Sequence, residues 1–221
     1  MNFKKNIGEK AADYVKDGMI VGLGTGSTAY WAIKKIGSLV RDGLKITAVA
    51  TSTNTQKLAI EEKIPMISLD DVEKLDLTID GADEFDPNKN LIKGGGGALL
   101  REKIVASLTD FYIIIADSSK RVDILGHFPL PVEVIPFAWQ VTFRKLENLG
   151  CMVQRRNVDG KPFVTDNQNY IMDCFFTRIE NPEDLQVKIN LIPGVVENGL
   201  FLNMTDVVIT NDENGNPLIL K

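Results

Sequence analysis

The sequence predicts an α/β fold in which a mostly parallel sheet is accompanied by a smaller α+β domain. Three observations lead to this prediction. The first half alternates apolar runs with helix-like stretches, as expected for parallel strands with helices on both faces. The pattern changes after residue 126, where prolines precede a new order of strands and helices. The length of 221 residues suits one large domain, or one domain with a smaller companion.

Apolar or β-branched runs in the first half predict strands, and the stretches between them predict helices. The strands are expected at residues 19–23, 45–50, 66–69, 75–79 and 111–116, and the helices at 28–40, 54–63 and 98–108. The run FYIIIA at 111–116 is almost wholly apolar, which is typical of a strand buried on both faces. Alternation of this kind favours parallel pairing.

The second half has a different pattern. The segment FPLPVEVIP carries three prolines. After it we expect a helix at 139–149, strands at 151–156 and 170–176, and a helix at 181–192. This βαββα-like order predicts a small α+β domain. Near the C-terminus, residues 206–210 and 217–220 flank NDENGN, whose turn-forming residues predict a hairpin.

Composition argues against several classes of function. The 25 Lys and Arg residues against 30 Asp and Glu give a net charge of −5 without a basic block, so we expect no nucleic-acid partner. Cys151 and Cys174 are too few for a zinc cluster or a disulfide framework, which favours a reducing, cytoplasmic location. His127 is the one imidazole, so a general base is expected to be a carboxylate.

No segment suggests a membrane partner. Residues 18–33 carry no charge, but this stretch is too short and too polar to span a bilayer. The N-terminal segment is charged and amphipathic, and it lacks the apolar core of a signal peptide.

The first motif with chemical potential is GLGTGST at residues 22–28, between an expected strand and an expected helix. Its glycines let the backbone approach a ligand, and the helix start offers N–H groups to an anion. The hydroxyls of Thr25, Ser27 and Thr28, which flank Gly26, add donors. The motif is neither a Walker loop nor GxGxxG, so it favours a phosphate cradle for a small molecule. The alternative is a tight turn capped by Thr28.

The second motif is an acidic cluster that follows the expected strand LDLTI and has Asp86 close behind. Its residues are Asp80, Gly81, Ala82, Asp83 and Glu84. The carboxyl end of a strand is a usual ligand position in open α/β sheets. Acids this close repel one another, which tends to raise at least one pKa unless cations lie near. From the spacing alone, catalysis, a site for Mg²⁺ or Ca²⁺, and a solvated turn all stay open.

The third motif, KGGGG, precedes the helix expected at 98–108. Its residues are Lys93, Gly94, Gly95, Gly96 and Gly97. Consecutive glycines are unfavourable to order and add no side-chain packing. They make sense where several backbone N–H groups face a ligand, as in an oxyanion hole, and Lys93 would add positive charge there. A merely flexible loop is the less favoured alternative.

Glu102 and Lys120 are weaker candidates. Helical periodicity places Leu100, Ile104 and Val105 on the apolar face and Glu102 away from it, so periodicity alone predicts a solvated glutamate. Glu102 lies one turn into the helix that follows the glycines, and this position makes it a candidate functional residue. Lys120 follows ADSS just beyond a strand, where it can meet a phosphate or be an ordinary surface lysine.

Five segments together resemble type A ribose-5-phosphate isomerase: GLGTGST, DGADE, KGGGGALLREK, IADSSKRVDILGHFPLPVEVIP and INLIPGVVENGLF. They occur in the family's order along nearly the whole chain. The resemblance implies a Rossmann-like domain with a smaller α+β, ferredoxin-like domain, for which we expect residues 1–127 plus 202–221 and residues 128–201. It also implies a homodimer or homotetramer without cofactor or metal. The implied reaction interconverts D-ribose 5-phosphate and D-ribulose 5-phosphate in the non-oxidative pentose phosphate pathway.

The resemblance implies roles at matching positions. Glu102 would be the catalytic base, assisted by Asp80, Asp83 and Lys93. An N-terminal lysine, Lys4 or Lys5, would add a phosphate contact. The sequence has KGGGG where KGGGA is common, and we expect the site to stay intact. The implied substrate-binding residues are Thr25, Gly26, Ser27, Thr28, Asp80, Gly81, Ala82, Asp83, Lys93, Gly94, Gly95, Gly96 and Lys120.

The chemistry of these residues fits such a reaction. Aldose–ketose isomerisation needs a base that moves a proton between C2 and C1, and donors for the negative oxygen of the enediolate. Two rival classes remain at this point. A sugar-phosphate sensor domain would need the phosphate cradle but not Glu102, and a transferase or deaminase could use a related α/β scaffold.

Overall fold

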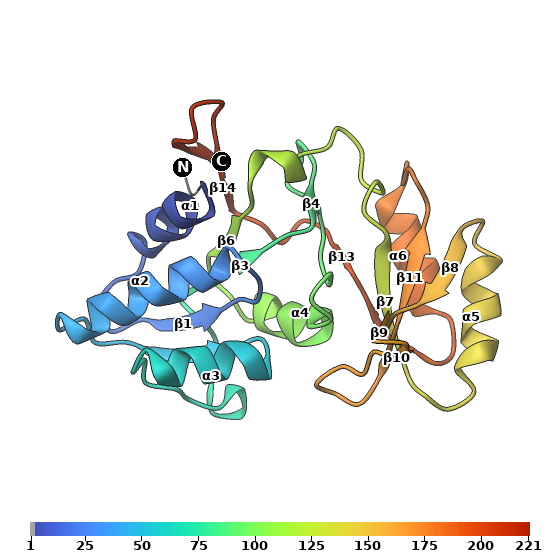
Figure 1. Ribbon diagram of the computed structural model, residues 1–221, viewed down its shortest axis with the longest axis horizontal. Coiled ribbons are helices and arrows are strands. Elements are labelled where there is room, and N and C mark those ends of the chain that lie inside the picture. Colours follow the sequence, from blue (N-terminus) through green and yellow to red (C-terminus); the bar gives the residue numbers. More distant parts are fainter. Residues whose placement is uncertain (1–2) are drawn as a thin grey trace. The chain divides into compact units, whose positions relative to one another are not determined.

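The computed structural model describes residues 3–221, which form two compact units (Figure 1). Unit 1 comprises the chain up to Ala82, Arg101–Arg121 and Met204–Lys221. Unit 2 comprises Asp83–Leu100 and Val122–Asn203. Relative to the boundaries expected from the sequence, residues 83–100, 122–127 and 202–203 group with the smaller unit.

Unit 1 is built on a six-stranded sheet with the strand order β15-β14-β6-β3-β1-β2. Every neighbouring pair is parallel except β14 with β15, which form the expected C-terminal hairpin. The chain runs from β1 to β2 on one side and then to β3 on the other. The carboxyl ends of β1 and β3 therefore form a switch point, where such sheets bind ligands. The strands are β1 (Ile20–Leu23), β2 (Thr47–Ala50), β3 (Leu77–Gly81), β6 (Tyr112–Ile115), β14 (Val207–Asn211) and β15 (Pro217–Leu220).

Helices cover both faces of this sheet, as predicted. Ile7 of α1 and Ile33 of α2 share a core cluster with Val21 and Ile113 on one face. Val105 of α4 packs with Val49 on the other face. The helices are α1 (Phe3–Ala12), α2 (Ala29–Arg41), α3 (Thr53–Glu61) and α4 (Leu99–Ser107), with short 3₁₀ turns η1 (Leu69–Asp71) and η2 (Ser118–Lys120).

The strand predicted at residues 66–69 is wrong. Only Met66 bridges to the sheet, through Ala48, and the chain then turns into η1. Ser68 accepts a hydrogen bond from the Asp70 N–H and so starts that turn. The apolar run Met-Ile-Ser-Leu is too short to distinguish a strand from a buried connection by pattern alone.

Unit 2 contains a four-stranded antiparallel sheet with the order β12-β7-β11-β8, which with its two helices follows the βαββαβ succession of a ferredoxin-like domain. Phe143 of α5 and Ile189 of α6 share one core cluster with Val132 and Met172, so both helices cover the same face (Figure 1). The elements are β7 (Leu130–Val134), α5 (Trp139–Glu147), β8 (Met152–Arg155), β11 (Tyr170–Phe175), α6 (Pro182–Asn190) and β12 (Val195–Asn198).

Two smaller sheets complete unit 2. The first has the order β13-β5-β4, and the second pairs β9 with β10. The strands are β4 (Glu84–Phe85), β5 (Leu91–Ile92), β9 (Asn157–Val158), β10 (Lys161–Pro162) and β13 (Leu200–Phe201).

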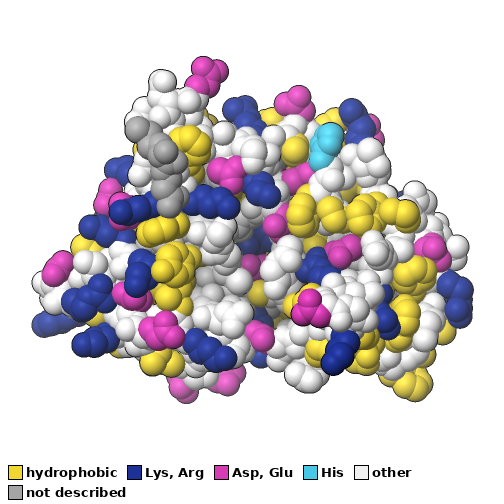
Figure 2. All heavy atoms as spheres, in the orientation of Figure 1, with side chains coloured by type: hydrophobic (Ala, Val, Ile, Leu, Met, Phe, Trp, Pro, Cys, Tyr) yellow, Lys and Arg dark blue, Asp and Glu magenta, His cyan; other side chains and the backbone are white. Residues whose placement is uncertain are grey.

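Three features bear on the predicted class of protein. No helix within residues 3–221 is long and apolar enough to cross a membrane. Cys151 and Cys174 are free thiols. His127 is exposed, and Figure 2 shows the imidazole, in cyan, at the surface.

Candidate functional site

The loop after β1 contacts the end of β3 within unit 1. The Gly24 N–H donates to the Ile79 carbonyl over 2.9 Å, and the Thr25 N–H donates to Asp80 Oδ1 over 3.0 Å. A Cβ at Gly24 would lie 2.1 Å from Asp80 Oδ1, so only glycine fits this position. Within unit 1, the structure thus brings the predicted phosphate loop and Asp80 of the acidic motif together at the switch point.

The hydroxyl of Thr25 is used within the loop. It lies 2.8 Å from Thr51 Oγ1, 2.9 Å from Ser52 Oγ and 3.1 Å from Thr55 Oγ1. This hydroxyl therefore joins the loop to the segment that begins α3, and its expected role as a ligand donor stays a prediction. Thr28 begins α2 without a side-chain capping hydrogen bond, so the alternative of a Thr28-capped turn is wrong.

Lys4 and Lys5, which the sequence could not separate, have different partners. Lys4 Nζ donates to Ser27 Oγ over 2.9 Å, at the tip of the loop. Lys5 lies 3.9 Å from Glu9 and 5.7 Å from the centroid of the Trp31 ring. Lys4 is therefore the cation that reaches the loop, where Gly26 turns the chain with a φ of 121°.

Asp80 is fully buried and holds three hydrogen bonds from its own unit. Besides Thr25, the Gly81 N–H donates to Oδ1 over 2.7 Å, and the Tyr112 hydroxyl donates to Oδ2 over 3.1 Å. Burial, followed by the negative charges of Asp80 and Glu102, raises the pKa of Tyr112 well above its usual value. Tyr112 therefore stays a neutral donor to Asp80, and the effect of Glu102 on it places the three groups in one neighbourhood.

Glu102 is 5% exposed, so the solvated position that periodicity alone predicts is wrong. The buried side of α4 carries Leu99, Glu102 and Val105, whereas Ile104 is 43% exposed. Ile104 instead lines a cavity of about 500 Å³ beside α3 and η1, which contains none of the predicted site residues. Glu102 lies in the first helical turn, where the helix dipole favours a negative charge.

Lys120 ends η2, directly after β6, which neighbours β3 in the sheet. The turn before it is anchored by Asn211 of β14. The Asn211 Oδ1 accepts from the Ser118 N–H over 3.0 Å, and its Nδ2 donates to Ser118 Oγ over 3.1 Å. The predicted phosphate lysine is thus the last residue of a turn that is fixed to the sheet.

In unit 2, the remaining acids of the acidic motif have separate partners. Asp83 Oδ2 accepts from the Gly95 N–H over 2.7 Å. Glu84 accepts from the N–H groups of Gly126 and Phe128, and Asp86 Oδ1 accepts from the Asn90 N–H over 2.8 Å. Among residues 3–221, no group of three acidic, histidine or cysteine side chains is arranged to hold a metal ion. Glu84 and Asp86 are thus fold-stabilising acids.

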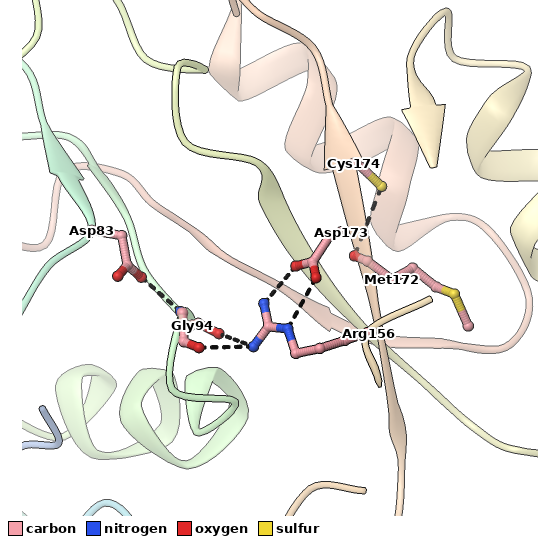
Figure 3. A network of polar contacts seen from close by, with 7 residues as sticks. Asp83, Gly94, Arg156, Met172, Asp173 and Cys174 are labelled. Atoms are coloured by element: carbon pink, nitrogen blue, oxygen red, sulfur yellow. Dashed lines mark hydrogen bonds and ion pairs between the residues drawn. The ribbon is translucent and has the colours of Figure 1, made fainter. Parts of the chain in front are cut away.

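The glycine motif forms a loop between β5 and α4. Lys93 is 2% exposed, and its Nζ lies 5.4 Å from the centroid of the Phe201 ring. Gly94 and Gly97 have φ values of 104° and 77°, which favour glycine. Gly95 and Gly96 between them are exposed. Figure 3 shows that Arg156 approaches this loop with its guanidinium group.

Comparison with known proteins gives the family. The sequence profile of ribose 5-phosphate isomerase A (phosphoriboisomerase A) matches residues 47–215. The chain belongs to this family. A ribose-5-phosphate isomerase A of Bacillus mycoides is 54% identical over 216 residues, which cover 97% of this chain and 98% of the relative. Membership makes the chain an isomerase, which confirms the activity predicted from the sequence.

Solved structures agree over the full length. The ribose 5-phosphate isomerase A of Methanocaldococcus jannaschii has a TM-score of 0.95 and 40% identity, and covers 100% of this chain and 98% of its own. A D-ribose-5-phosphate isomerase in complex with phospho-erythronic acid has a TM-score of 0.96 and 41% identity, with both chains covered fully. These matches confirm the predicted fold class.

Sequence reasoning missed three polar residues beside the predicted site. Tyr112 was hidden because it lies in an otherwise apolar strand, although it is the one residue of FYIIIA with a hydroxyl. Asn211 and Arg156 are distant in the chain from the residues that they hold. A single sequence contains no signal for such pairings.

Proposed function

We propose that this chain interconverts D-ribose 5-phosphate and D-ribulose 5-phosphate through an enediolate. The observation that carries the proposal is the buried Glu102 carboxylate in the neighbourhood of Asp80 and Tyr112. Removal of a carbon-bound proton needs a base that is shielded from bulk water and held in place. Family membership supports the same substrate pair.

Each catalytic role follows from the chemistry of its group. Glu102 moves the proton between C2 and C1. Asp80, which receives three hydrogen bonds, handles a hydroxyl or ring-oxygen proton, with Asp83 three residues along the chain. Lys93 and the N–H groups of the glycine loop stabilise the negative oxygen of the enediolate.

The phosphate group requires cations and backbone donors. We assign it to the loop of residues 25–28 and to Lys120, with Lys4 as the N-terminal contribution because it already reaches Ser27. The loop precedes the N-terminus of α2, a favourable place for an anion. Gly81 and Ala82, which follow Asp80 directly, complete the sugar-binding segment.

The proposal includes the state in which the enzyme works. It acts in the cytoplasm on a small sugar phosphate, without cofactor, metal or nucleic acid. It assembles as a homodimer or homotetramer. Unit 2 exposes large apolar side chains that support association, among them Phe137 at 83% and Leu191 at 76% exposure. Light scattering of the purified protein checks the assembly, and a monomer would contradict it.

A direct assay tests the activity. Formation of ribulose 5-phosphate from ribose 5-phosphate is followed with and without EDTA. We expect turnover that the chelator leaves unchanged. No turnover would contradict the proposed function and favour a sensor domain, whereas loss of activity with EDTA and recovery with Mg²⁺ would contradict the metal-free mechanism.

Substitution of the proposed base gives the sharpest test of the residues. Glu102→Gln keeps the shape but cannot accept the proton, so we expect kcat to fall by about 10²–10⁴-fold. The matched control is Glu61→Gln on the exposed end of α3, which should keep normal kcat. Near-normal turnover by folded Glu102→Gln enzyme would show that another group is the base.

A further inference from the structure

The glycine loop of unit 2 is held by a side chain from a different part of that unit. Arg156 Nη1 donates to the Gly94 carbonyl over 2.8 Å and to the Gly95 carbonyl over 3.0 Å (Figure 3). These contacts join positions 62 and 61 residues apart in the chain. A loop without side chains thus receives its order from one guanidinium group.

The guanidinium group is itself fixed. Its Nε donates to Asp173 Oδ2 over 3.0 Å and its Nη2 donates to Asp173 Oδ1, so the pair is bidentate. The two side chains are only 14% and 16% exposed. The Arg156 N–H donates to the Ile171 carbonyl of β11 over 2.9 Å, so both partners are fixed to one sheet.

These contacts determine which way the loop's N–H groups point. In a planar trans peptide, the carbonyl of one residue and the N–H of the next point in opposite directions. Because the Gly94 carbonyl points at Arg156, the Gly95 N–H points away from it, and that N–H donates to Asp83 Oδ2 over 2.7 Å. By the same rule, the Gly95 carbonyl directs the Gly96 N–H away from Arg156.

We propose that Arg156, held by Asp173, is a positioning residue that aims the Gly96 N–H at the developing enediolate oxygen. The charge of Arg156 also polarises the peptide that joins Gly95 to Gly96, which makes the Gly96 N–H a better donor to an oxyanion. The inference rests on the proposed function, because an oxyanion forms only if the isomerisation takes place. Beyond the proposed function, Arg156 is assigned the role of orienting the backbone N–H that binds the enediolate oxygen.

The main test compares Arg156→Met with Arg156→Lys in the full-length enzyme. Loss of one oriented oxyanion donor typically lowers kcat by about 10²–10³-fold, and we expect a fall of about 10²-fold for Arg156→Met. KM for ribose 5-phosphate should change by less than about threefold, since the donor acts in the transition state. Lysine should recover only part of kcat, because one ammonium cannot hold two carbonyls and Asp173 together.

Two further measurements separate positioning from folding. Phospho-erythronic acid carries a carboxylate in place of the reacting carbons, so its inhibition constant should rise with the loss of kcat. In Arg156→Ala, guanidinium added at a concentration too low to denature the protein should restore part of kcat. Should Arg156→Met not fold, Asp173→Asn replaces it. This variant keeps the shape of the partner, and its kcat should fall less than in Arg156→Met.

The control is Glu133→Gln. Glu133 is buried on β7, on the same sheet face as Asp173, and its Oε1 accepts from Thr165 Oγ1 over 2.9 Å and from Asn169 Nδ2 over 2.9 Å. It does not contact the glycine loop through any described hydrogen bond, so its kcat should be normal.

The outcomes are distinguishable. Inactive wild-type enzyme overturns the proposed function and this inference together. Active wild type with unchanged kcat in folded Arg156→Met overturns the inference alone. A raised KM at unchanged kcat, or an equal loss in Glu133→Gln, also overturns it, because either result indicates a binding or general structural role.

Discussion

The two units hold their candidate residues by different means. In unit 1, Asp80 belongs to strand β3. Its carboxylate accepts hydrogen bonds from Thr25 in the loop after β1, from Gly81 and from Tyr112 of the neighbouring strand β6. In unit 2, the glycine loop belongs to no strand, and Arg156 holds its carbonyls. Asp80 is oriented by the pairing of its strand within the sheet, whereas the glycine loop is oriented by the side chain of Arg156.

This difference determines how the position of Asp80 and the position of the glycine loop respond to the loss of a contact. A carboxylate on a central parallel strand keeps its position when one donor is lost, because the strand itself is fixed by pairing on both sides. A glycine loop has many alternative conformations, and ordering each residue costs about 1–2 kcal/mol of backbone entropy. Substitutions of residues that contact the glycine loop should therefore lower kcat more than their distance from the reacting atoms suggests.

The largest effect is expected from alanine at Gly24. Its Cβ would lie 2.1 Å from Asp80 Oδ1 and 2.4 Å from Asp80 Cα, so the strand backbone itself must move. We expect kcat to fall at least about 10²-fold, because small misplacements of catalytic groups have effects of this size. The unfolding free energy should fall by about 1–3 kcal/mol.

Alanine at Gly95 provides the comparison in unit 2. There the Cβ would meet the carboxylate of Asp83 at 2.5 Å, and a side chain can rotate away. The loss of stability should be smaller than in Gly24→Ala, while kcat still falls. Steady-state kinetics and thermal unfolding of both variants check this order. A greater loss of stability in Gly95→Ala would contradict the distinction between the two units.

An intermediate effect is expected from Tyr112→Phe. The change removes one of the donors to Asp80 and leaves the strand in place. A hydrogen bond to a charged group contributes about 1.5–3 kcal/mol, so kcat should fall about tenfold or somewhat more. The measurement is kcat at saturating ribose 5-phosphate. A loss as large as that of Glu102→Gln would mean that Tyr112 transfers a proton itself.

The smallest effect is expected far from the loop, at Glu62 of unit 1. Hydrogen bonds from Lys34 and then from Arg41 lower the pKa of Glu62. A lowered carboxyl pKa adds stability above the unfolded value of about 4.3, and this contribution disappears as the pH falls through the folded pKa. Glu62→Gln should lower the unfolding midpoint at pH 7 by about 2–4 °C.

The pH dependence distinguishes this ion pair from a packing effect. The difference between wild type and Glu62→Gln should be constant above about pH 5 and should vanish in more acidic solution. Thermal unfolding from pH 3 to 7 measures it, with Glu61→Gln as the exposed neighbouring control. A difference that persists unchanged at pH 3 would assign the effect to packing rather than to charge, since the Glu62 side chain lies so close to Gly37 that a Cβ there would be 2.6 Å from Glu62 Cβ.

The sequence allowed much of the fold and the position of the site to be predicted. Apolar runs, together with turn residues at the C-terminal hairpin, located all six strands of the unit 1 sheet, because periodicity reports burial directly. The acidic and glycine motifs were found because glycines and clustered acids have few structural uses. Their geometry agrees with those expectations, while the catalytic roles stay predictions.

Other features could not be predicted from local pattern. The burial of Glu102 depends on which side of α4 faces the sheet, and apolar residues lie on more than one side of that helix. The bounds of strand β7 were not predicted, because it contains Pro131 and has further prolines close to both ends. Prolines argue against a central strand, yet β7 lies between two other strands of its sheet. Arg156 and Asn211 act across long sequence separations, which a periodic pattern does not encode.

The position of β14 has a consequence for synthesis of the chain. This strand lies between β6 and β15, yet it consists of residues that follow the whole of unit 2. As the protein leaves the ribosome, unit 2 is complete while β6 still has an open edge, a site at which nascent chains can pair wrongly. Unit 1 begins first in the chain, but its sheet is completed last. Unit 2 can therefore fold before the sheet of unit 1 is complete.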